Sequence, residues 1–176
     1  MKTIEELVGE VKKSLGAVQS LPEKQVKPEP VTAVTEKVPV TVREDMTLGI
    51  AKEIAAAVET AAGIMGVQVV VAIRDAGANL VLLHAMDDSF IASVQVAQDK
   101  AYTAVALKMP THKALSESRG GALDGLTNGN GIMLLGGGYP LTAEGKIYGG
   151  VGVSGGTKEQ DAMLAAVAAE YFKIRF

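Results

Sequence analysis

Cysteine and tryptophan are absent from this sequence of 176 residues, and histidine occurs only twice. Without cysteine the chain can form no disulfide, no thiolate metal site and no cysteine nucleophile. Two histidines cannot build a three-histidine zinc site, and they do not form a His-Glu-x-x-His motif. Neither histidine stands in a recognisable pattern with a serine and a carboxylate, so the sequence names no catalytic residue.

Net charge and long apolar segments are also lacking. The formal net charge of −3 gives no electrostatic reason to expect nucleic acid as a partner. No apolar run approaches the roughly 20 residues that cross a bilayer, and the N-terminus lacks the apolar stretch of a secretory signal. We therefore expect a cytoplasmic protein without a membrane span. Aromatic residues make up only 4% of the chain, so aliphatic side chains must form the core.

Residues 1–20 are predicted to form an amphipathic leader helix. Thr3 and Glu6 match a capping box at its start. Its apolar stripe, at helical spacing, consists of Ile4, Leu7, Val8, Val11, Leu15 and Val18. Two interpretations stay open: the stripe docks back on the rest of the protein or joins copies of it, or it docks on another protein. A membrane-surface helix fits less well, because Lys is balanced by Glu and aromatic anchors are absent.

Residues 21–41 are predicted to form a linker, because four prolines stand there among polar residues. The remaining residues, 42–176, have the pattern of one globular domain. Helices are predicted at 47–65, 89–108 and 157–172, with a short helical piece starting at 110–111. Strands are predicted at 67–74, 80–85, 132–135, 139–142 and 146–154. Because hairpins dominate this order, we expect an α+β domain with an antiparallel sheet.

Glycine is concentrated near the end of the chain, where fourteen of the twenty glycines lie between Gly120 and Gly156. The segment 146–161 has the pattern of a strand, a glycine turn and a helix start. Its glycines either let a helix pack closely on the strand, or leave room for a ligand at the helix N-terminus. In the second case the wall of the ligand pocket consists of Ser154, Gly155, Gly156 and Thr157. The hairpin context does not match a dinucleotide-binding motif.

His84 and His112 are the candidate ligands of a haem or corrinoid metal. His84 ends a predicted strand, and His112 follows a predicted helix start, where backbone amides favour the neutral imidazole that binds metals. Met86 is a candidate soft ligand, although methionine more often fills a core. Asp75 and Asp99 are candidate acid or base residues, but Asp75 also suits a turn. Asp99 and Lys100, adjacent in the middle of a helix, suit structural hydrogen bonds or ion pairs.

Seven segments of the domain resemble the GlcG/HbpS family, which also occurs as the C-terminal domain of PduO proteins. They include a Met-Pro-Thr motif, a Gly-Gly-Gly-Tyr-Pro-Leu motif and the glycine turn before the last helix. The segments are 71–80, 84–87, 97–104, 109–111, 136–141, 149–157 and 159–161. The resemblance implies an α/β/α sandwich with a five-stranded antiparallel sheet and homo-oligomers up to octamers. It also implies haem or corrinoid binding, without an established reaction.

The iron-coordinating residues of this family are not uniform, so the resemblance alone assigns no ligand. Thr111 in the Met-Pro-Thr motif is one candidate position, and His112 beside it is the better haem-iron ligand on chemical grounds. His84 is the third candidate cofactor-binding residue. The adenosyltransferase domain of PduO has no counterpart in this sequence, so the resemblance does not imply cobalamin adenosylation.

The leader and linker resemble the encapsulation peptides that direct cargo into bacterial microcompartments. The main hypothesis is therefore an oligomeric haem-binding or corrinoid-binding accessory protein, which its leader docks on a microcompartment shell or cargo protein. One alternative is a small-molecule enzyme that binds its substrate at residues 154–157 and uses Asp75 or Asp99 as acid or base. The other alternative is a non-catalytic assembly scaffold.

Overall fold

The computed structural model describes residues 2–18 and 46–176, so the predicted linker and the predicted domain start at residue 42 lie outside the described residues. The helices are α1 (Ile4–Val18), α2 (Leu48–Met65), α3 (Ile91–Leu107), α4 (Thr111–Glu117) and α5 (Lys158–Arg175). The strands are β1 (Val70–Asp75), β2 (Leu80–Ala85), β3 (Gly138–Ala143) and β4 (Lys146–Ser154).

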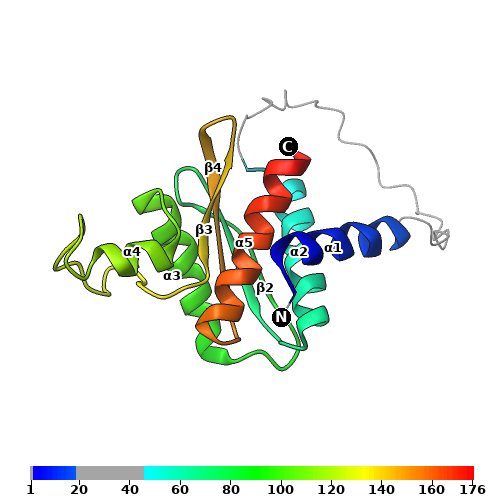
Figure 1. The fold of residues 1–176 in the computed structure, drawn as a ribbon, viewed down its shortest axis with the longest axis horizontal. Coiled ribbons are helices and arrows are strands. Elements are labelled where there is room, and N and C mark those ends of the chain that lie inside the picture. The colour runs from blue at the N-terminus through cyan, green and yellow to red at the C-terminus, as the bar shows by residue number, and fades with distance from the viewer. Residues whose placement is uncertain (1, 19–45) are drawn as a thin grey trace, which may run out of the picture.

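The four strands pair antiparallel in the order β2-β1-β4-β3, which leaves β2 and β3 at the two edges. Helices α2 and α5 cover one face of the sheet, and α3 covers the other (Figure 1). Alternate side chains of β1 serve the two faces, as the period of a strand requires. Val71 and Ile73 belong to the core under α2 and α5, whereas Val70 and Ala72 pack on α3. The α+β class and the sandwich architecture are confirmed.

The predicted fifth strand at 132–135 was wrong. Only an isolated bridge joins Gly129 and Ile132 there. Side chains take the amides that a strand would use: Met133 N–H donates to Thr103 Oγ1 at 2.7 Å, and Leu134 N–H donates to Asn128 Oδ1 at 2.7 Å. A local apolar run cannot reveal this competition, because Thr103 lies on α3, far away in sequence.

Helix ends follow the capping residues in the sequence. Thr47 caps α2 by accepting a hydrogen bond from the Ile50 amide at 3.2 Å, and Gly66 ends the helix with φ of 68°. Thr157 and Gln160 form a reciprocal capping box at the start of α5. The predicted capping box of the leader is confirmed as well. The Thr3 amide donates to Oε2 of Glu6 at 2.8 Å, and the Glu6 amide donates to Oγ1 of Thr3 at 3.2 Å.

The leader helix α1 lies across α2 and α5, outside the sandwich (Figure 1). Leu7 and Val11 are fully buried in the core cluster and Val8 is nearly so, whereas Ile4 stays exposed. Docking on its own domain is thus the interpretation that the structure supports. No helix of the described ranges is both long and apolar enough to cross a bilayer.

The glycines of β4 allow α3 to lie directly on the sheet. A Cβ atom at Gly150 would stand 2.8 Å from the carbonyl oxygen of Ala101, and one at Gly152 would collide with the carbonyl oxygen of Ala97. The prediction that glycine permits close packing of a helix on this strand is therefore confirmed.

Candidate functional site

A cavity of about 670 Å³ lies beside the edge strand β2. Its volume falls in the range of small-molecule sites, about 300–1,000 Å³. The end of β2 and the turn that follows it form one wall, and α2 contributes a carboxylate. The lining residues are Glu59, Gln68, Leu83, His84, Ala85, Met86, Asp87 and Asp88. The cavity thus combines a histidine and three carboxylates with apolar Leu83 and Met86.

His84 and Glu59 form a pair in this cavity. The Nδ1 atom of His84 lies 2.8 Å from Oε1 of Glu59, and both side chains are partly exposed. Because a carboxylate only accepts hydrogen bonds, this contact places a proton on Nδ1. The Nε2 atom makes no hydrogen bond within the described residues. A neutral imidazole held in this way offers Nε2 as a metal ligand, as a carboxylate–histidine pair does in metal sites.

His112 lies at the other edge of the sheet. It is exposed near the start of α4, and its ring centre is 5.6 Å from that of Tyr139 on β3. Strands β2 and β3 are separated by about 14 Å across the sheet, at roughly 4.8 Å per strand. His84 and His112 of one copy are therefore too far apart to bind opposite sides of the same iron.

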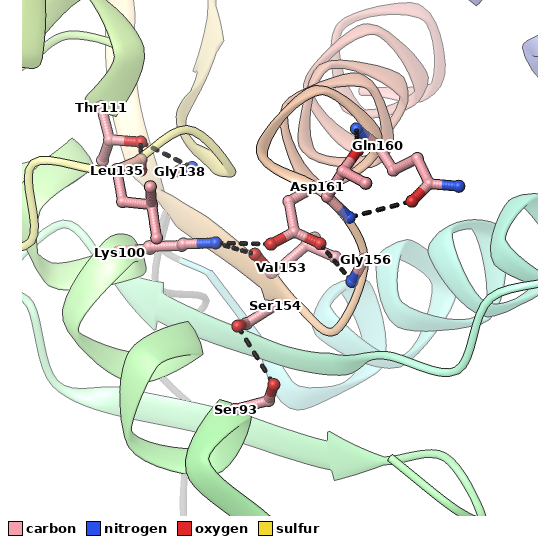
Figure 2. A network of polar contacts seen from close by, with 11 residues as sticks. Ser93, Lys100, Thr111, Leu135, Gly138, Val153, Ser154, Gly156, Gln160 and Asp161 are labelled. Carbon is pink, nitrogen blue, oxygen red and sulfur yellow. Dashed lines mark hydrogen bonds and ion pairs between the residues drawn. The ribbon is translucent and has the colours of Figure 1, made fainter. Parts of the chain in front are cut away.

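The hydroxyl of Thr111 connects α4 to the segment before β3. It donates to the carbonyl oxygen of Leu135 at 2.6 Å and accepts from the Gly138 amide at 2.9 Å (Figure 2). The Thr111 side chain is fully buried. These two bonds give Thr111 a structural role, and its hydroxyl does not face the cavity beside β2.

The residues of the predicted pocket wall, 154–157, make hydrogen bonds within the protein. Ser154 Oγ donates to Ser93 Oγ at 3.2 Å, and the Gly156 amide donates to the Asp161 carboxylate at 2.9 Å (Figure 2). Thr157 caps the helix. The negative charge that a helix N-terminus attracts is thus supplied by Asp161 of the same helix. Residues 152–156 also match Gly-x-Ser-x-Gly, but buried Ser154 makes no hydrogen bond with either histidine.

Lys100 is buried where α3, β4 and α5 meet, and it pairs with Asp161 (Figure 2). Its Nζ atom lies 2.7 Å from the carboxylate of Asp161 and 2.9 Å from the carbonyl oxygen of Val153. Burial lowers the pKa of Lys100, an effect that the carboxylate opposes. Burial likewise raises the pKa of Asp161 against the effect of the ammonium group. Sequence reasoning singled out Lys100 but not its partner.

The candidate acid or base residues have local partners. Asp75 accepts from the amide of Asn79 at 2.8 Å and so closes the turn between β1 and β2, as one interpretation of the sequence proposed. Asp99 accepts from the side-chain amide of Gln95, one turn away, at 2.7 Å. Neither residue makes a hydrogen bond with the segment 154–157 in the described parts of the chain.

Glu59 is the partner of His84 in the cavity that sequence reasoning missed. Residues 54–65 of α2 contain no other charged side chain, and this isolation was the available signal. Its partner His84 could not be identified, because the pairing depends on how α2 packs beside the edge strand. Within the described ranges no three histidine or acidic side chains gather closely enough to hold a bare metal ion.

Known proteins share this fold and much of this sequence. An uncharacterized 15.0 kDa protein from the dhaT-dhaS intergenic region of Citrobacter freundii is 45% identical over 130 residues, covering 72% of this chain and 92% of that protein. The corrinoid adenosyltransferase PduO of Citrobacter freundii is 39% identical over 112 residues, which cover 62% of this chain. These residues cover only 33% of PduO, so the match concerns a third of that protein.

A solved structure described as a PduOC:heme complex superimposes with a TM-score of 0.67 at 34% identity, covering 72% of this chain and 94% of that one. Residues 46–170 match the model of a family described as haem degrading protein HbpS-like. The resemblance predicted from the sequence is thereby confirmed, and the chain belongs to the HbpS-like family.

Proposed function

We propose that this protein binds haem in the cavity beside β2 and that Nε2 of His84 is an axial ligand of the iron. The observation that carries the proposal is the His84 imidazole, which lines the cavity and is held by Glu59 at 2.8 Å. The haem complex of the related PduOC supports the choice of ligand class. His84 replaces His112 as the preferred ligand, because the cavity wall includes His84 and does not include His112.

The residues present suit a metal that brings most of its own ligands. A porphyrin leaves only axial positions to the protein, so one imidazole is sufficient to hold the iron. Leu83 and Met86 would offer apolar contacts to a bound ring, and the carboxylates of Asp87 and Asp88 would repel its negatively charged propionates. Bound haem would supply a redox-active iron, while Glu59 fixes the orientation of the His84 ring. The same donor would also suit the cobalt of a corrinoid, which is the second candidate.

A titration with hemin tests this proposal. We expect a shifted Soret band that saturates at one haem per site. The His84→Ala variant should lose this band, while His112→Ala, which removes the exposed histidine at the other edge, should retain it. Glu59→Ala should weaken binding by about 10–100-fold, the usual effect of losing a residue that orients a ligand.

Saturable binding by His84→Ala with an unchanged spectrum would contradict the assignment. A response to cobalamin but not to hemin would favour the corrinoid.

We also propose that the protein forms a homo-oligomer. Phe90 and Ile91, at the start of α3, are 68% and 91% exposed. They adjoin the cavity residues Asp87 and Asp88 along the chain. Large apolar side chains exposed next to one another are typical of contact surfaces between proteins. This position supports an assembly in which a second copy lies close to the cavity.

The leader helix is the proposed targeting signal of the protein. We propose that residues 1–20 direct the chain to a bacterial microcompartment, a role supported by the amphipathic stripe and by the similarity to PduO. Residues 1–40 fused to a fluorescent reporter should form foci in cells that make shells. The same fusion with Leu7→Glu and Val11→Glu should stay diffuse, because these changes place two charges in the middle of the apolar stripe. Diffuse fluorescence from the unaltered fusion would contradict the targeting role.

A further inference from the structure

Among the described residues, the buried part of the contact between α1 and the rest of the protein is made by apolar side chains. Leu7, Val8 and Val11 are the buried residues of this contact. The polar bonds of α1 are internal: Lys2 pairs with Glu10 at 2.6 Å, and the capping box closes the first turn. Across the described residues no hydrogen bond or ion pair joins α1 to α2 or α5. An apolar contact without directional bonds fixes no unique partner copy.

The face that receives α1 is complete without it. Helices α2 and α5 pack on each other and on the sheet, so the 46–176 fold itself supplies this face. We call it the α2–α5 face. Its residues near the start of α1 include Ile64, Met65 and Met163. Together with Leu7 and the polar residues Lys2 and Gln160, they border a cavity of about 240 Å³. Incomplete filling of the contact forfeits dispersion attraction, which weakens the hold on α1.

The free energy gained by docking α1 is therefore close to the free energy that ordering the helix costs. Three buried side chains must order a helix of 15 residues, and a helix of this length is marginal in water on its own. The covalent connection through residues 19–45 raises the effective concentration of α1 at its own face. A second copy of α1 offers the same contacts, so it competes for this face once its local concentration approaches the effective concentration of the tethered helix.

We propose that the α2–α5 face is a helix-docking surface whose occupant, α1, can leave it and bind to the same face of a second copy. The docked state then hides Leu7, Val8 and Val11, and the released state presents them to another protein. This inference is independent of haem binding. It also adds a condition to the targeting role, since one apolar stripe cannot contact the domain and a shell protein together.

A labelled peptide of residues 2–18 tests the surface directly. It is titrated into the full chain and into the full chain with Leu7→Glu and Val11→Glu, which releases the tethered helix and vacates the face. The peptide should bind the vacated protein at least ten times more tightly than the wild type. A peptide that carries the same two substitutions should bind neither, and Lys13→Glu on the exposed side of α1 should leave the peptide's binding unchanged. A folded vacated variant that does not bind the peptide would overturn the proposal.

Hydrogen exchange on the unaltered full chain provides a second measurement that does not depend on the variant. Amides of α1 should exchange at least about a hundred times faster than those in the centres of α2 and α5, because α1 opens without global unfolding. Equal protection of all three helices would overturn the proposal. The reporter experiment separates this result from targeting, because residues 1–40 can direct a reporter to shells even where the α2–α5 face does not bind α1.

Discussion

Lys100 and Asp161 show how a single pair can link distant parts of the chain. Lys100 comes from the middle of α3, whereas Asp161 comes from the first turn of α5 and also accepts the amide of Gly156. Both charges are out of contact with water, and each is tolerated because the other is present. A pair of this kind contributes less to stability than its short distance suggests, but the loss of one member is costly.

Replacement of Lys100 by methionine should destabilise the protein by about 3–5 kcal/mol, because the carboxylate of Asp161 would remain buried without a counter-charge. Chemical denaturation at pH 7 measures this change. The control is the double variant Lys100→Met with Asp161→Leu, which removes both charges. Its loss should be clearly smaller than the sum of the two single losses. Additive losses would show that the two groups do not depend on each other.

The stability of the Lys100→Met variant should also depend on pH. Burial raises the pKa of Asp161 above its ordinary value, and the loss of Lys100 removes the ammonium group that opposes this rise. A native state with a raised pKa binds more protons than the unfolded state between the two pKa values. Its free energy of unfolding therefore falls as the pH rises through this window. We expect Lys100→Met to lose less stability relative to the wild type at pH 5 than at pH 8.

At the residue scale the sequence identified candidates better than their partners. His84 was identified as a candidate ligand, and Lys100 was recognised as unusual inside a helix. Glu59 and Asp161 were not connected to them, because these contacts form between segments that are distant in sequence. The helix caps at Thr3, Thr47 and Gly66 were predictable, since each depends on residues within one turn.

At the scale of elements, the approach of α3 to β4 depends on glycine. Gly152→Ala should destabilise the protein by about 2–3 kcal/mol, because the added methyl group meets the backbone of α3 rather than a flexible side chain. Gly63→Ala on α2 is the matched control, since nothing beyond the adjacent backbone of its own helix lies within 4 Å of the added group. It should stabilise the protein by about 0.5–1 kcal/mol through helix propensity. Thermal unfolding of both variants measures the two opposite changes in stability. A Gly152→Ala variant as stable as the wild type would contradict the packing argument.

Most elements could be predicted because each has a local signal. The caps Thr47 and Gly66 bound α2, the apolar β-branched run indicates β1, and the turn between β3 and β4 consists of Glu144 and Gly145. The segment 132–135 failed because its apolar pattern reflects packing beside α3, while Thr103 and Asn128 satisfy the amides of Met133 and Leu134. Periodicity records which side chains are buried, but it does not record where the backbone amides find their acceptors.

At the scale of the whole molecule, the order of the strands decides which candidate residues can act together. The sequence offers His84 and His112 as candidate ligands and, on chemical grounds, prefers His112 for the iron. The topology puts them at opposite edges of the sheet and gives a carboxylate partner to His84. This separation could not be predicted, because the order β2-β1-β4-β3 is a property of the assembled sheet. The sandwich itself was predictable from the hairpins and the family resemblance.

The meeting of α3, β4 and α5 at Lys100 also has a consequence for folding. The ammonium group reaches all its acceptors only when the carbonyl oxygen of Val153 and the carboxylate of Asp161 are both in place. A partly assembled chain that has α3 on the sheet but lacks α5 would leave Lys100 without its carboxylate partner. Such an intermediate is disfavoured, so the C-terminal helix must arrive together with the rest, and the domain should fold as one cooperative unit.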